Sequence, residues 1–425
     1  MPEKFFIDRP PRIEPELPSG VFNIPNPPDI EDNPGQVLSQ AFLPMIMIFG
    51  YILVSVMGEG RNMLMMVPMV MSVIGSVALA VWTYLEDKKQ KEIMEAAYIR
   101  RISELRRKMV SEKEQQRIYY FHNYPDPEKN LQIAADIHRA KEQRLEDLRS
   151  GTRLWERRSN DHDFLHLRLG LSTRQSTVTY KLSENEKTDN SLTLEARRLA
   201  EDSRLVFNVP VTIPLFFSYN EEEQRKVQEK TDDSESGAGE GETAEQKGKS
   251  VRHAIGITGS SRDKVYAYMR TLLVDFATHH SPQDAVLYVA GTNESRKHWR
   301  WAYPLPHCQG GKDTETLVFE NDEQPGENEY DRMRNFWRSL RTILERRRMR
   351  IQDREKGADV RLPFILVVVD VQDPAPAWSA LRDLEGEATV STILLDGQLL
   401  GAGIIFLVPE RSKVPSRCTA VIEVD

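Results

Sequence analysis

The residues with the clearest chemical potential lie where a strand-like segment meets a helix-like one. Residues 256–263 read Gly-Ile-Thr-Gly-Ser-Ser-Arg-Asp and join a predicted strand, His253–Thr258, to a predicted amphipathic helix, Asp263–His279. At such a junction the backbone N–H groups of a P-loop surround phosphate groups. The position and the glycines therefore make this segment a candidate nucleotide site.

Three positions of this junction depart from a working P-loop. Such a loop ends in glycine, lysine and a serine or threonine, of which the last two contact phosphate and Mg²⁺. Here Ser261, Arg262 and Asp263 occupy those positions, while Gly256 and Gly259 keep the earlier glycines. A carboxylate at position 263 would repel phosphate, and it equally suits a plain helix N-cap.

A second candidate residue ends an apolar strand. Phe364–Val369 leads into Asp370, which has the place of a Walker B aspartate that would hold Mg²⁺. The next residue is Val371 and not the glutamate that would activate water. The residues leave three hypotheses open, which are ATP hydrolysis, nucleotide binding without hydrolysis, and a purely structural role. They assign no catalytic residue and no metal ligand.

The elements around these residues alternate between strand and helix. Phe164–Leu171 and Thr177–Leu182 have the two-residue alternation of strands. Later strands and a long basic helix are predicted at Ala285–Ala290, Phe364–Val369, Gly403–Val408, Thr419–Val424 and Glu329–Glu355. Repeated βα units predict the α/β class, with a mostly parallel sheet that helices cover. Between these regions, Glu221–Ser250 is rich in Glu, Asp, Gly, Ser and Lys, which predicts a disordered insertion.

Length and composition limit the classes of protein that the chain can belong to. Its 425 residues suffice for two or three domains. The two cysteines, Cys308 and Cys418, exclude a disulfide scaffold and a four-cysteine zinc site. With 57 basic and 65 acidic residues the net charge is −8, which argues against a nucleic-acid partner.

Two uncharged, apolar runs stand near the start of the chain. They are Val37–Gly58 and Met63–Leu85, joined by the four polar residues 59–62. Each run is close to the roughly 20 residues that a helix needs to cross a bilayer. Buried core helices are the alternative, but two such runs with so short a connection are hard to bury in a small domain. The sequence therefore predicts a two-helix transmembrane hairpin over residues 37–85.

Charges that flank the hairpin predict its orientation. Lys88, Lys89 and Lys91 follow the second run directly, and basic flanks stay in the cytoplasm. A hairpin returns both of its ends to one side, so we expect a protein of the cell membrane with both termini cytoplasmic. Residues 1–36 form a proline-rich tail, which could lie along a partner or along its own domain.

After the hairpin the pattern becomes helical. Helices are predicted at about Glu86–Tyr120 and Glu128–Leu148, with a turn at Tyr124–Pro127 between them. These would pair as an antiparallel helical stalk over residues 86–150, in contact with the lipid surface or with solvent. Residues 151–425 then form the ATPase-like domain, with the insertion at 221–250 inside it.

One segment after the stalk carries a specific resemblance. Leu154–Arg158 reads Leu-Trp-Glu-Arg-Arg, and with the residues after it this segment resembles the signature of EccC-type proteins, the FtsK/SpoIIIE-like membrane ATPases of type VII (ESX) secretion. The departures are Ser159 and His162, which stand where prolines are usual. Other segments that look like the family are Arg9–Pro11, Asp163–Leu165, Leu167–Gly170, Val209–Val211, Leu272–Asp284, Trp299, Trp301 and Leu305–His307.

The resemblance implies a hexamer-forming, membrane-anchored motor subunit. Such a subunit works with other type VII membrane subunits and exports WXG100-type helical-hairpin proteins. In the family the membrane-proximal ATPase-like domain is degenerate, and the modules that use ATP and Mg²⁺ follow it, which here means beyond about Asp425 or in a separate chain. The implied role is that of the membrane-anchoring and coupling part. The alternatives are an active ATP-hydrolysing subunit, an FtsK-like DNA translocase and a plain membrane scaffold.

Overall fold

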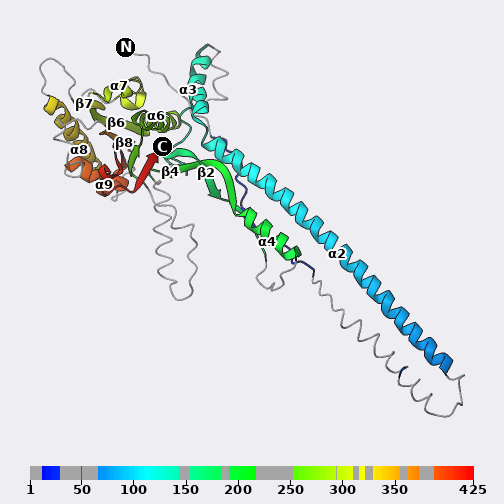
Figure 1. The fold of residues 1–425 in the computed structure, drawn as a ribbon. Coiled ribbons are helices and arrows are strands. Elements are labelled where there is room, and N and C mark those ends of the chain that lie inside the picture. Colours follow the sequence, from blue (N-terminus) through cyan, green and yellow to red (C-terminus); the bar gives the residue numbers. More distant parts are fainter. Residues whose placement is uncertain are drawn as a thin grey trace. The chain divides into compact units, whose positions relative to one another are not determined.

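The computed structural model describes residues 12–28, 49, 66–142, 153–182, 191–216, 252–292, 294–309, 315–320, 329–354, 362–372 and 387–425. These residues belong to two compact units, which are described separately (Figure 1). The first unit comprises Met1–Glu14, Tyr120–Ser172 and Val209–Asp425. The second comprises Pro15–Tyr119 and Thr173–Asn208. The domain boundaries given above stay predictions, since each unit combines segments that are distant in the sequence.

A six-stranded sheet is the centre of the first unit. Its order is β10-β5-β9-β8-β6-β7, and every neighbouring pair is parallel. The predicted α/β class with a parallel sheet is confirmed. The strands are β5 (Ala254–Gly259), β6 (Ala285–Thr292), β7 (Leu317–Glu320), β8 (Phe364–Asp370), β9 (Ala402–Leu407) and β10 (Ala420–Val424).

Helices cover both faces of this sheet. Along β8, Phe364, Leu366 and Val368 belong to one apolar cluster, and the three residues between and after them belong to another. Helix α6 (Arg262–His279) packs into the first cluster, while α8 (Glu329–Arg354) and α9 (Ala388–Leu400) pack into the second. Strands buried on both faces are apolar at every position, which explains the unbroken run of β8.

Shorter elements complete the first unit. They include α7 (Arg296–Trp299) and two 3-10 turns, Pro306–Cys308 and Arg411–Lys413. Helix α9 ends at Gly401, whose φ of 61° is the left-handed conformation that glycine adopts at helix ends. A separate two-stranded sheet pairs β2 (His166–Gln175) with β4 (Leu205–Pro214), of which residues 166–172 and 209–214 belong to this unit.

The second unit has a core of its own around residues 66–119 of helix α2 (Met66–Asn123), and the last residues of this helix, from Tyr120 on, belong to the first unit. Strand β1 (Gly20–Asn23) pairs in parallel with β3 (Val178–Lys181), and α4 (Ser191–Ser203) completes the unit. Its buried residues are Ile24, Tyr98, Ile102, Met109, Val178, Tyr180, Leu192, Ala196 and Leu199. The Tyr98 hydroxyl donates to the Pro25 carbonyl at 3.0 Å. In this unit, residues 15–28 of the proline-rich tail therefore lie along their own chain, which is one of the two predicted alternatives.

Both predicted stalk segments contain helices. The first lies within α2, which runs from Met66 to Asn123. The second is α3 (Pro127–Glu142), which packs against α6, and Asn130 of α3 donates a hydrogen bond to Asp275 of α6 at 3.1 Å. The antiparallel pairing of the two as a stalk stays a prediction.

The membrane hairpin falls largely outside the described residues. The first predicted span, Val37–Gly58, is outside them except for Phe49, and residues 66–85 of the second form the start of α2. Among the residues that the structure describes, a helix with the length and apolar character for crossing a bilayer was not found. The hairpin stays a prediction, and the predicted insertion, residues 221–250, also lies outside the described residues.

Candidate functional site

The predicted site residues gather at one edge of the parallel sheet. Strand β5 leads into α6, β8 ends at Asp370, and β9 lies between these two strands. In open α/β sheets this carboxyl edge is where ligands bind. The structure links Arg262 to Asp370 through a third residue, Tyr266, which stands one turn into α6. Gly256 and Gly259, in contrast, serve packing.

Both glycines of the predicted loop make close backbone approaches. Gly256 lies within β5, where an added Cβ would be 2.5 Å from Cγ1 of Val414. Gly259 ends β5, and an added Cβ would collide with the carbonyl oxygen of Val424 in the neighbouring strand β10. Tight packing on the sheet therefore accounts for both glycines.

The connection from β5 to α6 is two residues long. It consists of Ser260 and Ser261, and the Ser261 side chain makes no cap hydrogen bond. A phosphate-binding loop needs a longer run of successive N–H groups that curve around the anion. Arg262 hydrogen-bonds the Tyr266 hydroxyl, and the Asp263 side chain is exposed.

Donors from several segments surround the carboxylate of Asp370, which is fully buried. The Tyr266 hydroxyl lies 3.1 and 3.0 Å from its two oxygens, and Trp299 Nε1 donates to Oδ2 at 2.7 Å. The backbone N–H of Gln372 donates to Oδ1 at 3.2 Å, and the Ser295 side chain also bonds the carboxylate. Burial raises the pKa of Asp370, and these hydrogen bonds oppose the rise.

These contacts bear on the three hypotheses on nucleotides. An aspartate that binds Mg²⁺ needs an oxygen that faces the ion, yet both oxygens of Asp370 already accept hydrogen bonds from the protein. Burial, and then the charge of Asp370, raise the pKa of Tyr266, so its hydroxyl keeps the proton that it donates. The residues present do not fit a magnesium nucleotide, and the geometry favours the structural hypothesis.

Sequence reasoning missed Tyr266 and Ser295 and found Trp299 only through the family resemblance. One signal was available for Tyr266, because it follows Arg262 by four residues and so lies on the same face of the helix. The contact of its hydroxyl with Asp370 joins residues 104 positions apart, which helical spacing cannot reveal.

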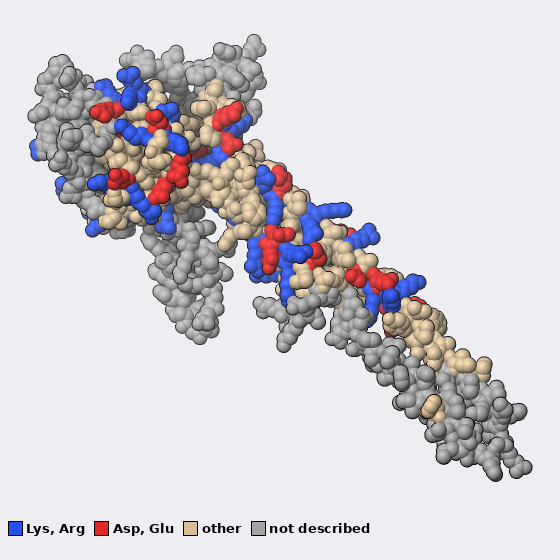
Figure 2. All heavy atoms as spheres, in the orientation of Figure 1, with Lys and Arg blue, Asp and Glu red and all other residues tan. Residues whose placement is uncertain are grey.

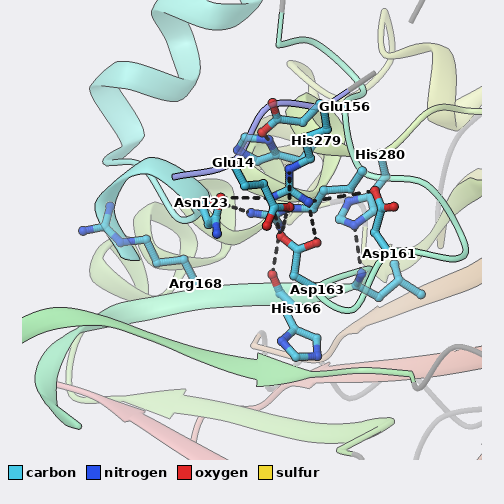
Figure 3. Close-up of polar contacts among 12 residues, drawn as sticks. Glu14, Asn123, Glu156, Asp161, Asp163, His166, Arg168, His279 and His280 are labelled. Carbon is cyan, nitrogen blue, oxygen red and sulfur yellow. Dashed lines mark hydrogen bonds and ion pairs between the residues drawn. The ribbon is translucent and has the colours of Figure 1, made fainter. Parts of the chain in front are cut away.

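A second polar cluster lies where α6 ends (Figure 3). We call it the Arg157 network, and its members are Arg12, Asn123, Asn130, Glu156, Arg157, Asp163, Asp275, His279 and His280. Arg12 holds Asp163 with two hydrogen bonds of 2.6 and 2.8 Å, and Nε of Arg157 lies 3.1 Å from Oδ2 of the same carboxylate. Burial raises the pKa of Asp163, but Arg157 and Arg12 outweigh it and hold the pKa far below the ordinary value.

Arg157 joins three parts of the first unit. It is fully buried and donates to the backbone carbonyls of His166 at 3.0 Å and of Asn123 at 2.6 Å. Its backbone N–H donates to the His279 carbonyl at 3.0 Å. The Leu-Trp-Glu-Arg-Arg segment thus contributes a buried cation that fixes the start of β2 and the ends of α2 and α6.

Two buried histidines end α6 inside this network. His280 accepts from the Leu165 N–H at 2.9 Å and donates through Nδ1 to the Phe276 carbonyl at 2.8 Å, which defines a neutral tautomer. His279 hydrogen-bonds Asn130 at 3.0 Å. Burial lowers the pKa of both histidines, and the charge of Arg157 lowers it further. For Glu156, hydrogen bonds from His279 and Arg153 overcome burial and lower the pKa to about 2.

One group of possible metal ligands belongs to the same region. Ligand atoms of Glu14, His162 and Asp163 lie within 4.8 Å of one another. The guanidinium of Arg12 occupies both oxygens of Asp163 and also lies 3.0 Å from Glu14. Since a fixed cation already neutralises these carboxylates, the group does not suit a metal ion.

Comparisons with known proteins place the chain near one group. No family model matches it. It is similar to the ESX secretion system protein EccC of Geobacillus thermodenitrificans, at 24% identity over 373 residues, which are 85% of this chain and 21% of that protein. The EccC of Thermomonospora curvata is 23% identical over 315 residues, 70% of this chain and 19% of that protein. The chain thus spans about a fifth of the length of these relatives.

Solved structures were compared as well. The cytoplasmic domain of EssC aligns with 41% of this chain and 33% of its own, at 21% identity and a TM-score of 0.31. Thermomonospora curvata EccC (ATPases 2 and 3), in complex with a signal sequence peptide, aligns with 62% of this chain and 35% of its own, at 16% identity and a TM-score of 0.33. From the sequence similarity over most of its length, the chain is a distant relative of the EccC ATPases of type VII, or ESX, secretion.

Proposed function

We propose that this chain is the membrane-anchoring and coupling part of a type VII secretion motor. Its α/β domain transmits movement and does not hydrolyse ATP. The distant relation to EccC supports the secretion role. The observation that carries the coupling role is the buried Asp370 carboxylate, whose oxygens are held by Tyr266 and Trp299 in the place where a motor would hold Mg²⁺.

Helix α6 supplies a route for coupling inside the first unit. Near its start, Tyr266 contacts Asp370 at the carboxyl edge of the sheet. At its end, His279 and His280 belong to the Arg157 network. A packed helix of 18 residues moves as one body, so a displacement at the sheet edge reaches the network.

The proposal includes the membrane and the partners. Residues 37–85 would anchor the chain in the cell membrane with both ends in the cytoplasm. Other type VII membrane subunits and further copies of this chain would surround it. WXG100-type substrates would be moved by the ATPase modules that use ATP and Mg²⁺.

Nucleotide titration of the purified full chain tests the coupling role. With a fluorescent ATP analogue and Mg²⁺ we expect no saturable binding up to millimolar concentration and no hydrolysis. In the organism that encodes the chain, we expect its removal to stop export of WXG100-type proteins and the wild-type gene to restore it. Steady ATP hydrolysis that Asp370→Ala abolishes would show instead that the domain is a motor.

A further inference from the structure

A basic hollow lies beside α7, at the carboxyl edge of the sheet in the first unit. It has a volume of about 680 Å³, and its lining is Glu294, Arg296, Lys297, Arg300 and Tyr303. Over the first unit, Figure 2 shows Lys and Arg side chains interspersed with Asp and Glu side chains. The proposed coupling function does not use these lining residues. Asp370 is contacted instead by other, buried side chains such as Tyr266 and Trp299.

The lining carries three cations against one carboxylate. Lys297 and Arg300 are exposed, and Arg296 is half-buried. His298 stands between them, and its ring stacks on Tyr266 with 3.9 Å between the ring centroids. Burial lowers the pKa of His298, as do the charges of Lys297, Arg262 and Arg270, while the charge of Asp263 raises it. Basic side chains of α7 and of α6 therefore both act on this ring.

The shape and the side chains fit an extended anion better than a compact one. The cations follow one another along the short helix, so carboxylates spaced along a peptide can reach them in turn. Tyr303 is 40% exposed and offers a ring against which the stems of such side chains can pack. Glu294 would repel a phosphate group that filled the hollow. An extended peptide can run beside Glu294 and direct its carboxylates toward the cations instead.

We infer that this hollow binds an acidic peptide segment of a partner protein. The Asp or Glu side chains of the segment pair with Lys297, Arg300 and Arg296, and arginine can hold a carboxylate with two parallel hydrogen bonds. Such binding depends on charge, and it therefore weakens as salt concentration rises.

The test uses the full chain in detergent and a fluorescein-labelled hexaglutamate peptide. Fluorescence anisotropy at low salt should show saturable binding. The charge reversal Lys297→Glu with Arg300→Glu should weaken binding about tenfold, as expected when two exposed ion pairs become repulsive. The matched control is Arg346→Glu with Arg350→Glu, two exposed residues of α8, which changes the net charge equally and should leave affinity within about twofold.

Three results would overturn the inference. Equal weakening by both double variants would mean non-specific attraction to a basic surface. Inorganic pyrophosphate that displaces the peptide at equal concentration would mean a phosphate site. A large gain in affinity on deletion of residues 232–245, which are acidic and contain no Lys or Arg, would mean that the chain's own segment fills the hollow. The nucleotide titration that tests the coupling role is independent of all three results.

Discussion

Arg157 shows at the scale of one residue how a buried charge organises structure. Its guanidinium meets the Asp163 carboxylate and two backbone carbonyls, and Arg12 completes the neutralisation of that carboxylate. A buried ion pair adds little stability by itself, but the loss of one partner leaves a charge that water cannot solvate. The network therefore makes the first unit sensitive to single substitutions.

Asp163→Asn should destabilise the first unit strongly. The change leaves Arg12 and Arg157 buried without their shared carboxylate, which costs about 3–5 kcal/mol of the free energy of unfolding. Urea unfolding followed by tryptophan fluorescence measures it. The matched control is Asp161→Asn, because Asp161 is more exposed and lies 3.9 Å from Arg12, so its loss should cost less than about 1 kcal/mol. Equal losses for the two variants would contradict the network.

The buried His280 predicts a loss of stability in mild acid. Its folded pKa is well below 6.5, so below pH 6.5 the unfolded chain takes up a proton that the folded chain does not. The contribution of neutral His280 to the free energy of unfolding is complete above pH 6.5. It declines as pH falls toward the folded pKa, by up to about 1.4 kcal/mol per pH unit. Arg157 and His279 disfavour the proton, while Asp163 and the Phe276 carbonyl favour it.

Urea unfolding at pH 7.5, 6.5 and 5.5 measures this dependence. His280→Gln should reduce the slope of the profile even where it lowers stability overall, since the amide does not titrate. His162→Gln is the control, because that side chain is exposed, and it should keep the wild-type slope. A profile that His280→Gln leaves unchanged would assign the acid sensitivity to other groups.

At the scale of elements, the strand–helix junction has the position of a P-loop and the packing of an ordinary βα unit. Gly256→Ala should destabilise the sheet, because its Cβ would collide with Val414. The cost of such overpacking is about 1–3 kcal/mol. Val414→Ala removes the colliding methyl groups. The double variant should therefore lose less stability than the two single variants lose together, and thermal unfolding of all three measures this. An additive result would mean that Gly256 does not pack against Val414.

Elements with a local signal could be predicted from the sequence. The apolar run of β8 and its final aspartate indicated a buried parallel strand, and the structure agrees. Helix α2 continues through the change from apolar to charged residues after Leu85, because such a change does not interrupt helical hydrogen bonds. The contact of α3 with α6 was missed, since the Asn130–Asp275 hydrogen bond joins residues 145 positions apart.

The candidate site was predictable only in part for the same reason. Its position at the β5–α6 junction follows from the local order of strand, glycines and helix. The sequence also shows directly that other residues replace those that bind phosphate in a P-loop. Two of the donors to Asp370, Trp299 and Tyr266, lie 71 and 104 positions away in the sequence, which no periodicity connects. Likewise, Arg12 and Asp163 are separated by 151 positions. Long-range polar pairing is set by tertiary packing, and it appears only in the structure.

For the whole molecule, the predicted hairpin has a direct test. Deletion of residues 37–85 should release the chain from the membrane fraction, whereas the wild type should stay there after a carbonate wash. The reason is that two spans of about 20 apolar residues bury far more apolar surface than peripheral attachment does. Deletion of residues 232–245 is the control and should not release the chain. Recovery of the wild type in the soluble fraction would contradict the anchor.

The parallel pairing of β1 with β3 also fixes an order of events during synthesis. Gly20 pairs with Val178, so the early strand has no partner until 158 further residues have been made. At about 5–20 residues per second, that interval lasts roughly 8–30 seconds. Residues 37–85 leave the ribosome well within it. The amino-terminal segment is therefore unpaired while the predicted spans would enter the bilayer, and closure of the second unit is a late folding step of high contact order.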